Sequence, residues 1–193
     1  MRKIRTAILI SGRGSNMRSL VEAAQTPDFP AEIVLVLSNR PDASGLEFAT
    51  QMGINCACVD HKAFKNRMDF DAEMQKILVA QRIELVCLAG FMRLLTPDFV
   101  NAWRGRMINI HPALLPAYKG LHTHERALAD NAKQHGCTVH FVTPEMDEGE
   151  IILQHAVPVL AGDTPASLAA RVLEQEHIAY PEALASVAQR LQI

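Results

Sequence analysis

The chain has 193 residues, of which 49% are hydrophobic and 21% are charged, and its formal net charge is −2. This length suits one domain with a full hydrophobic core, and the composition excludes a largely disordered chain. The nearly balanced charge argues against a nucleic-acid or membrane-surface binder, because such proteins carry a basic excess. No apolar run reaches the roughly 18 residues that a membrane-spanning helix needs.

The N-terminus and the cysteines indicate a cytoplasmic protein. Residues 1–10 have the basic start and short apolar run of a signal peptide, but Ser11 and Gly12 interrupt that run at once. A strand that enters a glycine turn fits this pattern better. The cysteines lie in or beside apolar segments, form no CxxC pair and are expected to be buried free thiols. They are Cys56, Cys58, Cys87 and Cys137.

Short β-branched runs alternate with helical patterns over the first 111 residues. We expect strands at 4–10, 32–38, 55–59, 83–89 and 106–111, and helices at 15–24, 44–52, 67–82 and 97–104. Continuous apolar strands are typical of a parallel sheet that is covered on both faces. The alternation of strands and helices predicts such a sheet, with right-handed crossovers.

The pattern changes after His111. Residues 112–125 contain prolines, glycines and two histidines and are expected to form a loop. Residues 137–143 and 151–159 are expected to be two strands that pair antiparallel, because only a short turn joins them. A helical stretch starts near residue 163, and Pro181 is expected to divide it into two helices.

These elements predict one α/β domain over residues 1–193, since the chain shows no repeat, linker or low-complexity tract. We expect a Rossmann-like open twisted sheet, mostly parallel with an antiparallel C-terminal hairpin, and helices on both faces. Ligands of such sheets bind at the carboxyl ends of the strands.

A glycine turn, SGRGSN at 11–16, separates the first strand from the first helix. Gly12 and Gly14 allow the backbone to turn sharply and to approach a ligand closely. The amides of Gly14, Ser15 and Asn16 would then lie at a helix N-terminus, where the helix dipole favours an anion. The turn therefore predicts a phosphate site, against the alternative of a tight turn without a ligand.

A dinucleotide site is a second interpretation of this turn. The GxGxxG fingerprint requires a third glycine, where this chain has Met17. It also prefers an acidic residue after the second strand, where the chain has Asn39 and Arg40. Because an arginine there can suit the 2′-phosphate of NADP, an NADP-dependent reductase remains a rival that Met17 weakens.

Two polar side chains end the strand at 106–111. Asn109 and His111 point to the same side of that strand, because side chains alternate, and Ile110 points to the other. Both can donate a hydrogen bond to an oxyanion, and a histidine can also move a proton, which suits chemistry at a carbonyl. A histidine that caps a strand without any chemistry is the alternative.

The turn at 144–150 carries four acidic residues, and a carboxylate brought near His111 would favour its charged form. Spacing leaves open which of the four reaches it: Glu145, Asp147, Glu148 or Glu150. His122 and His124 could share a metal ion, but no cysteine or carboxylate stands nearby at the usual zinc spacing. We expect no metal site and assign no catalytic role to the other histidines.

At this point the chain resembles the folate-dependent glycinamide ribonucleotide transformylases over nearly its whole length. No single one of the matching stretches is as specific as the set. They are ILISGRGSN, LSNRPDASGLEFA, LAGFMRLLTPDFV, INIHPALLPAYKGLHTHERAL, GCTVHFVTPEMDEGEIILQ and EQEHIAYPEAL. The resemblance implies the formyltransferase fold and transfer of the formyl group of 10-formyltetrahydrofolate to the amine of glycinamide ribonucleotide, in de novo purine (IMP) synthesis.

The resemblance also implies roles for individual residues. The family's catalytic trio falls on Asn109, His111 and Asp147. Its ribonucleotide-binding residues fall on Gly14, Ser15, Asn16, Leu173 and Glu176, of which Glu176 matches the carboxylate that binds the ribose hydroxyls. Its folate-binding residues fall on Arg67, Phe91, Met92, Arg93, Leu94, Leu95, Asn109, Thr143, Pro144, Glu145, Met146 and Asp147. Arg67 matches an arginine near the glutamate tail of the folate.

Related enzymes of the same fold are the alternatives. Formyltetrahydrofolate hydrolases share the Asn–His–Asp trio but usually carry an additional N-terminal domain, and methionyl-tRNA formyltransferases add a C-terminal RNA-binding domain. We expect neither addition here, and the segment KGLHTHERAL is more similar to the ribonucleotide enzymes. The expected partners are therefore the two small substrates, without nucleic acid or membrane, in a monomer or a homodimer.

Overall fold

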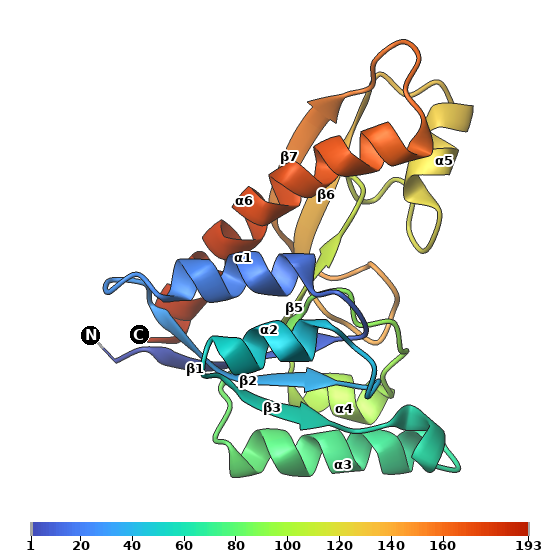
Figure 1. The fold of residues 1–193 in the computed structure, drawn as a ribbon. Helices are drawn as coiled ribbons and strands as arrows, with labels where there is room; N and C mark the ends of the chain where they lie inside the picture. The colour runs from blue at the N-terminus through green and yellow to red at the C-terminus, as the bar shows by residue number, and fades with distance from the viewer. Residues whose placement is uncertain (1, 193) are drawn as a thin grey trace.

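The computed structural model describes residues 2–192, and its centre is a twisted seven-stranded sheet (Figure 1). The spatial order of the strands is β3-β2-β1-β4-β5-β6-β7. Strands β1 to β5 are parallel, whereas β6 is antiparallel to both of its neighbours, which confirms the expected fold class. The strands are β1 (Ile4–Ile10), β2 (Ala31–Ser38), β3 (Asn55–Cys58), β4 (Leu85–Leu88), β5 (Met107–His111), β6 (Gln134–Phe141) and β7 (Ile151–Pro158).

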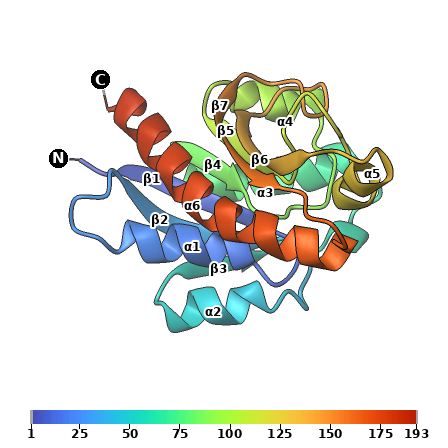
Figure 2. The same ribbon diagram turned by 90° about the horizontal axis from the view of Figure 1, so that it is seen from above.

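Helices cover the sheet on both faces, and Figure 2 shows α6 and α1 side by side on one of them. On β1, Ile8 packs into the core beneath these helices and Leu9 packs into the core of the opposite face, because strand side chains alternate. One face carries α1 (Ser15–Ala24), α2 (Gly45–Gln51), α5 (Thr123–Ala129) and α6 (Pro165–Leu191). The other carries α3 (Arg67–Ala80) and α4 (Pro97–Ala102), and a 3-10 turn, η1 (His61–Ala63), follows β3.

The chain reverses its direction of travel across the sheet between β1 and β4. From β1 it proceeds outward through β2 and β3, and it then returns to the other side of β1 to build β4 and β5. The connections at the carboxyl ends of β1 and β4 therefore diverge, which opens a crevice for a ligand at this switch point.

The last helix differs from the expectation, because α6 is continuous over 27 residues with Pro181 inside it. A proline in a helix interior costs about 3 kcal/mol through its missing N–H and its steric clash. The neighbours Tyr180 and Leu184 are fully buried in the core, and each such side chain contributes about 1.5–3 kcal/mol by burial. Packing on the sheet therefore outweighs the local preference for a break.

A second correction concerns the segment expected to be a loop up to residue 125. The loop ends at His122, and α5 begins at Thr123. The Thr123 hydroxyl donates to the Pro112 carbonyl at 2.7 Å and so ties the start of this helix to the end of β5. A seven-residue helix is too short to show helical periodicity in the sequence.

The cysteines divide into two groups. Cys87 and Cys137 are buried free thiols, as expected, whereas Cys56 and Cys58 are exposed. The expectation of burial was wrong for these two residues because β3 is an edge strand of the sheet. Within residues 2–192, no helix is both long and apolar enough to cross a membrane.

Candidate active site

The turn after β1 places Gly14 immediately before α1, with a left-handed backbone at φ 69°. This backbone conformation favours glycine, whereas a Cβ atom at this position would meet only the flexible end of the Met17 side chain, at 2.7 Å from its Cε. Ser15 and Asn16 then form the first turn of α1, where backbone amides face outward. The structure thus forms the helix N-terminus that the sequence predicts as an anion site.

Asn16 joins this turn to α6. Its side-chain Nδ2 donates to Oε2 of Glu176 at 2.6 Å, and its Oδ1 is buried without a hydrogen-bond partner among residues 2–192. Glu176 is only 7% exposed, and burial raises the pKa of its carboxyl group, opposed in part by the hydrogen bond from Asn16. Leu173 lies one helical turn earlier on α6 and is half-buried.

A cavity of about 500 Å³ lies at the switch point. It is lined by the 11–16 turn, by residues 89 and 90 after β4, and by residues 92 and 93. The segments that the resemblance assigns to the ribonucleotide and to the folate therefore share one cavity. Ser11 connects two other residues that line this cavity. The backbone N–H of Met92 donates to the Ser11 hydroxyl at 2.7 Å, and that hydroxyl donates to Oδ1 of Asn39 at 2.6 Å.

A second cavity of about 250 Å³ adjoins the first and is rich in cationic side chains. Lys65, Arg67 and Arg93 line it, and Arg93 also lines the larger cavity. Asn66 caps the N-terminus of α3 between them by accepting from the Asp69 amide at 2.9 Å. These charges suit a ligand that carries carboxylates.

The segment at 91–95 presents apolar side chains at the edge of the larger cavity. Met92 is 70% exposed and Leu94 is 56% exposed, whereas Phe91 and Leu95 are half-buried. The segment is anchored at its far end, where Thr96 donates through both its backbone N–H and its hydroxyl to Asp71 on α3.

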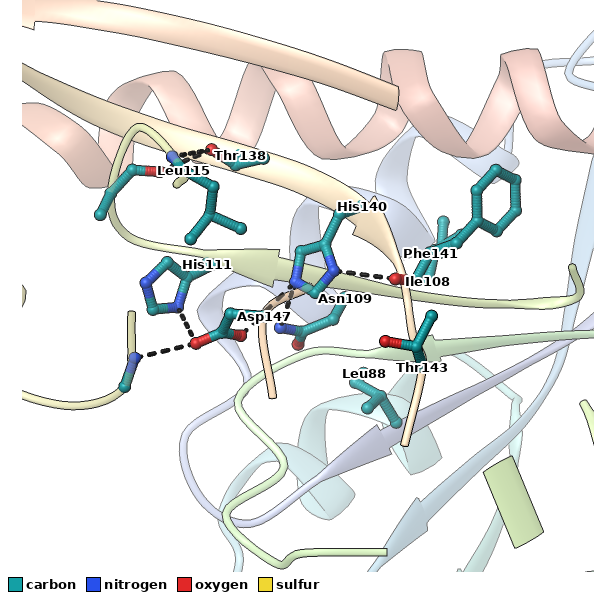
Figure 3. A network of polar contacts seen from close by, with 12 residues as sticks. Leu88, Ile108, Asn109, His111, Leu115, Thr138, His140, Phe141, Thr143 and Asp147 are labelled. Carbon is teal, nitrogen blue, oxygen red and sulfur yellow. Dashed lines mark hydrogen bonds and ion pairs between the residues drawn. The ribbon is translucent and has the colours of Figure 1, made fainter. Parts of the chain in front are cut away.

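One row of paired residues crosses the sheet and includes Asn109 of β5. Leu88 pairs with Leu9 on one side and with Asn109 on the other, and Asn109 pairs with His140 of the antiparallel β6. Asn109 and His111 lie on the same side of β5, as the alternation of side chains predicts (Figure 3). They stand next to the switch point, on the strand that neighbours β4.

His111 is buried and has an acceptor at each ring nitrogen. Its Nε2 lies 2.9 Å from the carbonyl oxygen of Tyr118, and its Nδ1 lies 3.5 Å from Oδ2 of Asp147. A doubly protonated imidazolium can donate toward both acceptors at once. Of the four acidic residues in the turn, the structure brings Asp147 to His111.

His140 is a member of this cluster that the sequence reasoning missed. Its Nε2 lies 3.7 Å from Oδ1 of Asp147 and 3.3 Å from Nδ2 of Asn109, and its Nδ1 lies 2.9 Å from the Phe141 carbonyl oxygen (Figure 3). Burial lowers its pKa, with hydrogen bonding and Asp147 acting in the opposite direction. A neutral ring that donates from Nδ1 accepts from Asn109 at Nε2 and orients that amide. Only the register between β5 and β6 identifies this contact.

The loop that carries Asp147 is held against β6. Gly149 packs so tightly that a Cβ atom there would overlap the Phe141 carbonyl oxygen, so no other residue fits without a shift. Asp147 itself has a left-handed backbone, with φ 55°. The Thr143 hydroxyl donates to the Glu145 carbonyl at 3.0 Å, while Pro144, Glu145 and Met146 are exposed.

The two histidines considered as metal ligands point to other partners. Nδ1 of His122 lies 3.6 Å from a carboxylate oxygen of Glu125, and the ring of His124 packs edge-on against His135. Within residues 2–192, no three His, Cys, Asp or Glu side chains are grouped so that they could hold a metal ion.

The site thus combines a glycine turn at a helix N-terminus, a buried carboxylate near it and an Asn–His–Asp cluster at the carboxyl ends of the strands. The Formyl transferase family matches residues 4–184. The chain belongs to the formyl transferase family. This formyl transferase is 47% identical to "Phosphoribosylglycinamide formyltransferase" of Escherichia coli, over 90% of its own length and 82% of that protein.

The similarity extends to longer proteins and to solved structures. This formyl transferase is 48% identical to the human "Trifunctional purine biosynthetic protein adenosine-3" over 97% of its own length, but it spans only 18% of that protein. Phosphoribosylglycinamide formyltransferase from Brucella melitensis superposes with a TM-score of 0.94 at 49% identity, covering 97% of this chain and 96% of that one.

Proposed function

We propose that this formyl transferase moves the formyl group of 10-formyltetrahydrofolate to the amine of glycinamide ribonucleotide. The products are formylglycinamide ribonucleotide and tetrahydrofolate, and the step belongs to de novo purine synthesis. The observation that carries the proposal is that the glycine turn after β1 and the Asn109, His111 and Asp147 cluster at the end of β5 lie on the same side of the sheet, with only β4 between the two strands. The names of the relatives support the same reaction.

The ribonucleotide is proposed to bind through the turn at 14–16. Its phosphate accepts from the amides at the start of α1, where the helix dipole favours an anion. Glu176 accepts from the ribose hydroxyls through its carboxylate, which Asn16 holds in place at 2.6 Å. Leu173 contributes apolar contact from the same face of α6. These contacts direct the amine toward the end of β5.

The folate is proposed to bind between residues 91–95 and residues 143–147. Exposed Met92, Leu94 and Met146 offer apolar surface to its ring system. Arg67 and Arg93 line the adjoining cationic cavity, which suits the carboxylates of the glutamate tail. The donor is consumed as a substrate, and the proposal includes no metal ion.

The substrate amine attacks the formyl carbon and gives a tetrahedral intermediate whose oxygen carries negative charge. Asn109 donates a hydrogen bond to that oxygen, the positive charge of protonated His111 stabilises it, and Asp147 holds the His111 ring in place at 3.5 Å. The bond between the carbon and the folate nitrogen then breaks. That nitrogen gains a proton through His111, the amine loses one, and the neutral amide product forms.

Formyl transfer is tested by following the absorbance of a 10-formyl folate mixed with purified protein, with and without glycinamide ribonucleotide. We expect turnover only in the presence of the ribonucleotide. Equal loss of the formyl group without the ribonucleotide would identify a hydrolase that uses the same cluster. Binding of NADP without formyl transfer would identify a reductase, and either result overturns the proposal.

The compartment proposed for this activity is the cytoplasm. The four cysteines form no disulfide in the structure. Free thiols are typical of a reducing compartment, and both proposed substrates are small water-soluble molecules. Fractionation of cells that express the protein, with activity measured in each fraction, tests this assignment.

A further inference from the structure

Two loops meet over the Asn–His–Asp cluster, and their contact has no role in the proposed chemistry so far. One is the 112–122 loop that follows β5, and the other is the 142–150 loop between β6 and β7. Lys119 forms an ion pair with Glu148, and the next residue, Gly120, donates its backbone N–H to Oδ2 of Asp147 at 2.9 Å. Consecutive residues of one loop thus bind consecutive residues of the other.

The segment at 118–120 also contacts His111 directly and is held in place by Arg126. The Tyr118 carbonyl faces Nε2 of His111 at 2.9 Å. Arg126 on α5 donates to the Lys119 carbonyl at 2.7 Å, and its guanidinium lies 5.5 Å from the centre of the Tyr118 ring. A movement of this segment would therefore disturb both acceptors of His111 together.

Neither loop is held in this shape by its own backbone preferences. Tyr118, His122 and Asp147 all have left-handed backbones, with φ of 56°, 57° and 55°. Such conformations are unfavourable for residues other than glycine and persist where surrounding contacts enforce them. The side chains of His111 and Asp147 are 7% and 9% exposed, so the contacts between the loops also keep water from the reacting centre.

We propose that Lys119 and Glu148 are positioning residues that latch the two loops together and hold the Asp147 carboxylate toward His111. The inference rests on the proposed formyl transfer. Both residues act through Gly120 and Asp147, so loss of the pair lowers kcat. The KM for the ribonucleotide stays unchanged, because Glu176 and the turn at 14–16 contact neither residue.

The pair is partly open to solvent, with side chains 34% and 54% exposed, so its strength is sensitive to salt. Exposed pairs contribute little, and exchange of one charge replaces attraction by repulsion. We expect Lys119→Glu and Glu148→Lys each to lower kcat about fivefold, with the KM for the ribonucleotide within about twofold of wild type. The double variant, in which the charges are exchanged, should recover most of the loss.

A second readout follows the loop itself without activity. Chymotrypsin cleaves after Tyr118, and Glu148→Lys leaves the residues around that bond unchanged. We expect faster cleavage there in Glu148→Lys than in wild type. The matched control exchanges the charges of Glu73 and Lys76 on α3, an exposed pair at 2.9 Å, and should alter neither kcat nor cleavage.

Three results would overturn the latch: single variants with wild-type kcat, a double variant as slow as the slower single variant, or cleavage unaffected by Glu148→Lys. A rise in the KM for the ribonucleotide in the single variants, with kcat unchanged, would also contradict the latch. Absence of formyl transfer in the wild type would refute the proposed function instead. The proteolysis comparison would then still decide whether the pair holds the loops together.

Discussion

Asn109 and His111 are two residues apart on one strand, and the chemistry proposed for them depends on that separation. Alternation along β5 places both side chains on the same side of the strand. His140 and Asp147 contact them from β6 and from the following loop. The cluster therefore has its donors on a rigid strand and its orienting groups on neighbouring elements.

Removal of either donor should lower turnover without unfolding the protein. Loss of one oxyanion donor typically costs about 10²-fold or more in rate. We expect Asn109→Ala and His111→Ala each to reduce kcat for formyl transfer by at least that factor. Far-UV circular dichroism should remain that of the wild type. Turnover close to wild type in either variant would contradict the assignment.

Glu176 combines a proposed binding role with a cost to stability. Because burial raises its pKa in the folded protein, the folded state retains the proton to higher pH than the unfolded chain does. Its contribution to stability is thus complete below the ordinary glutamate pKa and is lost as the pH rises through the raised value. Glu176→Gln mimics the protonated form and keeps an oxygen for Asn16.

We therefore expect Glu176→Gln to be at least as stable as wild type at pH 8, with any difference shrinking toward pH 4.5. Urea unfolding at both pH values measures this. The KM for the ribonucleotide should rise at least about tenfold at pH 8, because a neutral amide is a weaker acceptor for the ribose hydroxyls. A variant less stable than wild type at pH 8 would show that the buried carboxylate stabilises the fold.

At the scale of elements, α6 links the site to the centre of the sheet. Its Tyr180 hydroxyl lies 2.9 Å from the Leu88 carbonyl oxygen and 3.2 Å from that of Ile108, at adjacent strands. Glu176 lies one turn earlier on the same helix and reaches the turn at the start of α1. The helix therefore sets the position of the carboxylate relative to β4 and β5.

Tyr180→Phe tests this connection. The substitution keeps the ring and removes a buried donor, which typically costs about 1–3 kcal/mol. We expect the free energy of unfolding in urea to fall by that amount, with kcat for formyl transfer within about threefold of wild type. An unchanged free energy of unfolding would mean that the two carbonyls do not depend on this hydroxyl.

At the scale of the whole molecule, a single sheet separates two apolar cores. Trp103 is buried in the core beneath α3 and α4, while Tyr180 and Leu184 are buried in the core beneath α1 and α6. Both cores include side chains of β1, such as Leu9 and Ile8. Because every strand contributes to the same sheet, neither core can persist without the other.

We therefore expect residues 1–193 to unfold as one cooperative unit. Fluorescence of Trp103 reports on one core, and far-UV circular dichroism reports on the helices of both faces. The two urea transitions should coincide, as two-state unfolding requires. Glycinamide ribonucleotide at about 100 times its Kd should raise the free energy of unfolding by about 2.7 kcal/mol in both signals. Separated midpoints would show that the chain contains two independent units.

Much of the fold was predictable because its signals are local. The apolar runs of β1 and β4 and the glycine turn at 11–16 indicate strands and a helix start from neighbouring residues alone. The expected parallel sheet and the antiparallel hairpin are confirmed, whereas α5 and the continuity of α6 were missed. Alternation along one strand likewise placed Asn109 and His111 on one side. The roles of the site residues stay predictions until the variants are measured.

By itself, then, the sequence determined the order of the strands along the chain, the glycine turn before α1 and the placement of Asn109 and His111 on one side of β5, since each depends on a few adjacent residues. Tertiary packing alone decided the rest. It selected Asp147 among four acidic residues, through the close approach of Gly149 to β6. It brought His140 opposite Asn109 through strand register. It also kept α6 continuous through Pro181, because burial on the sheet outweighs a local helix preference.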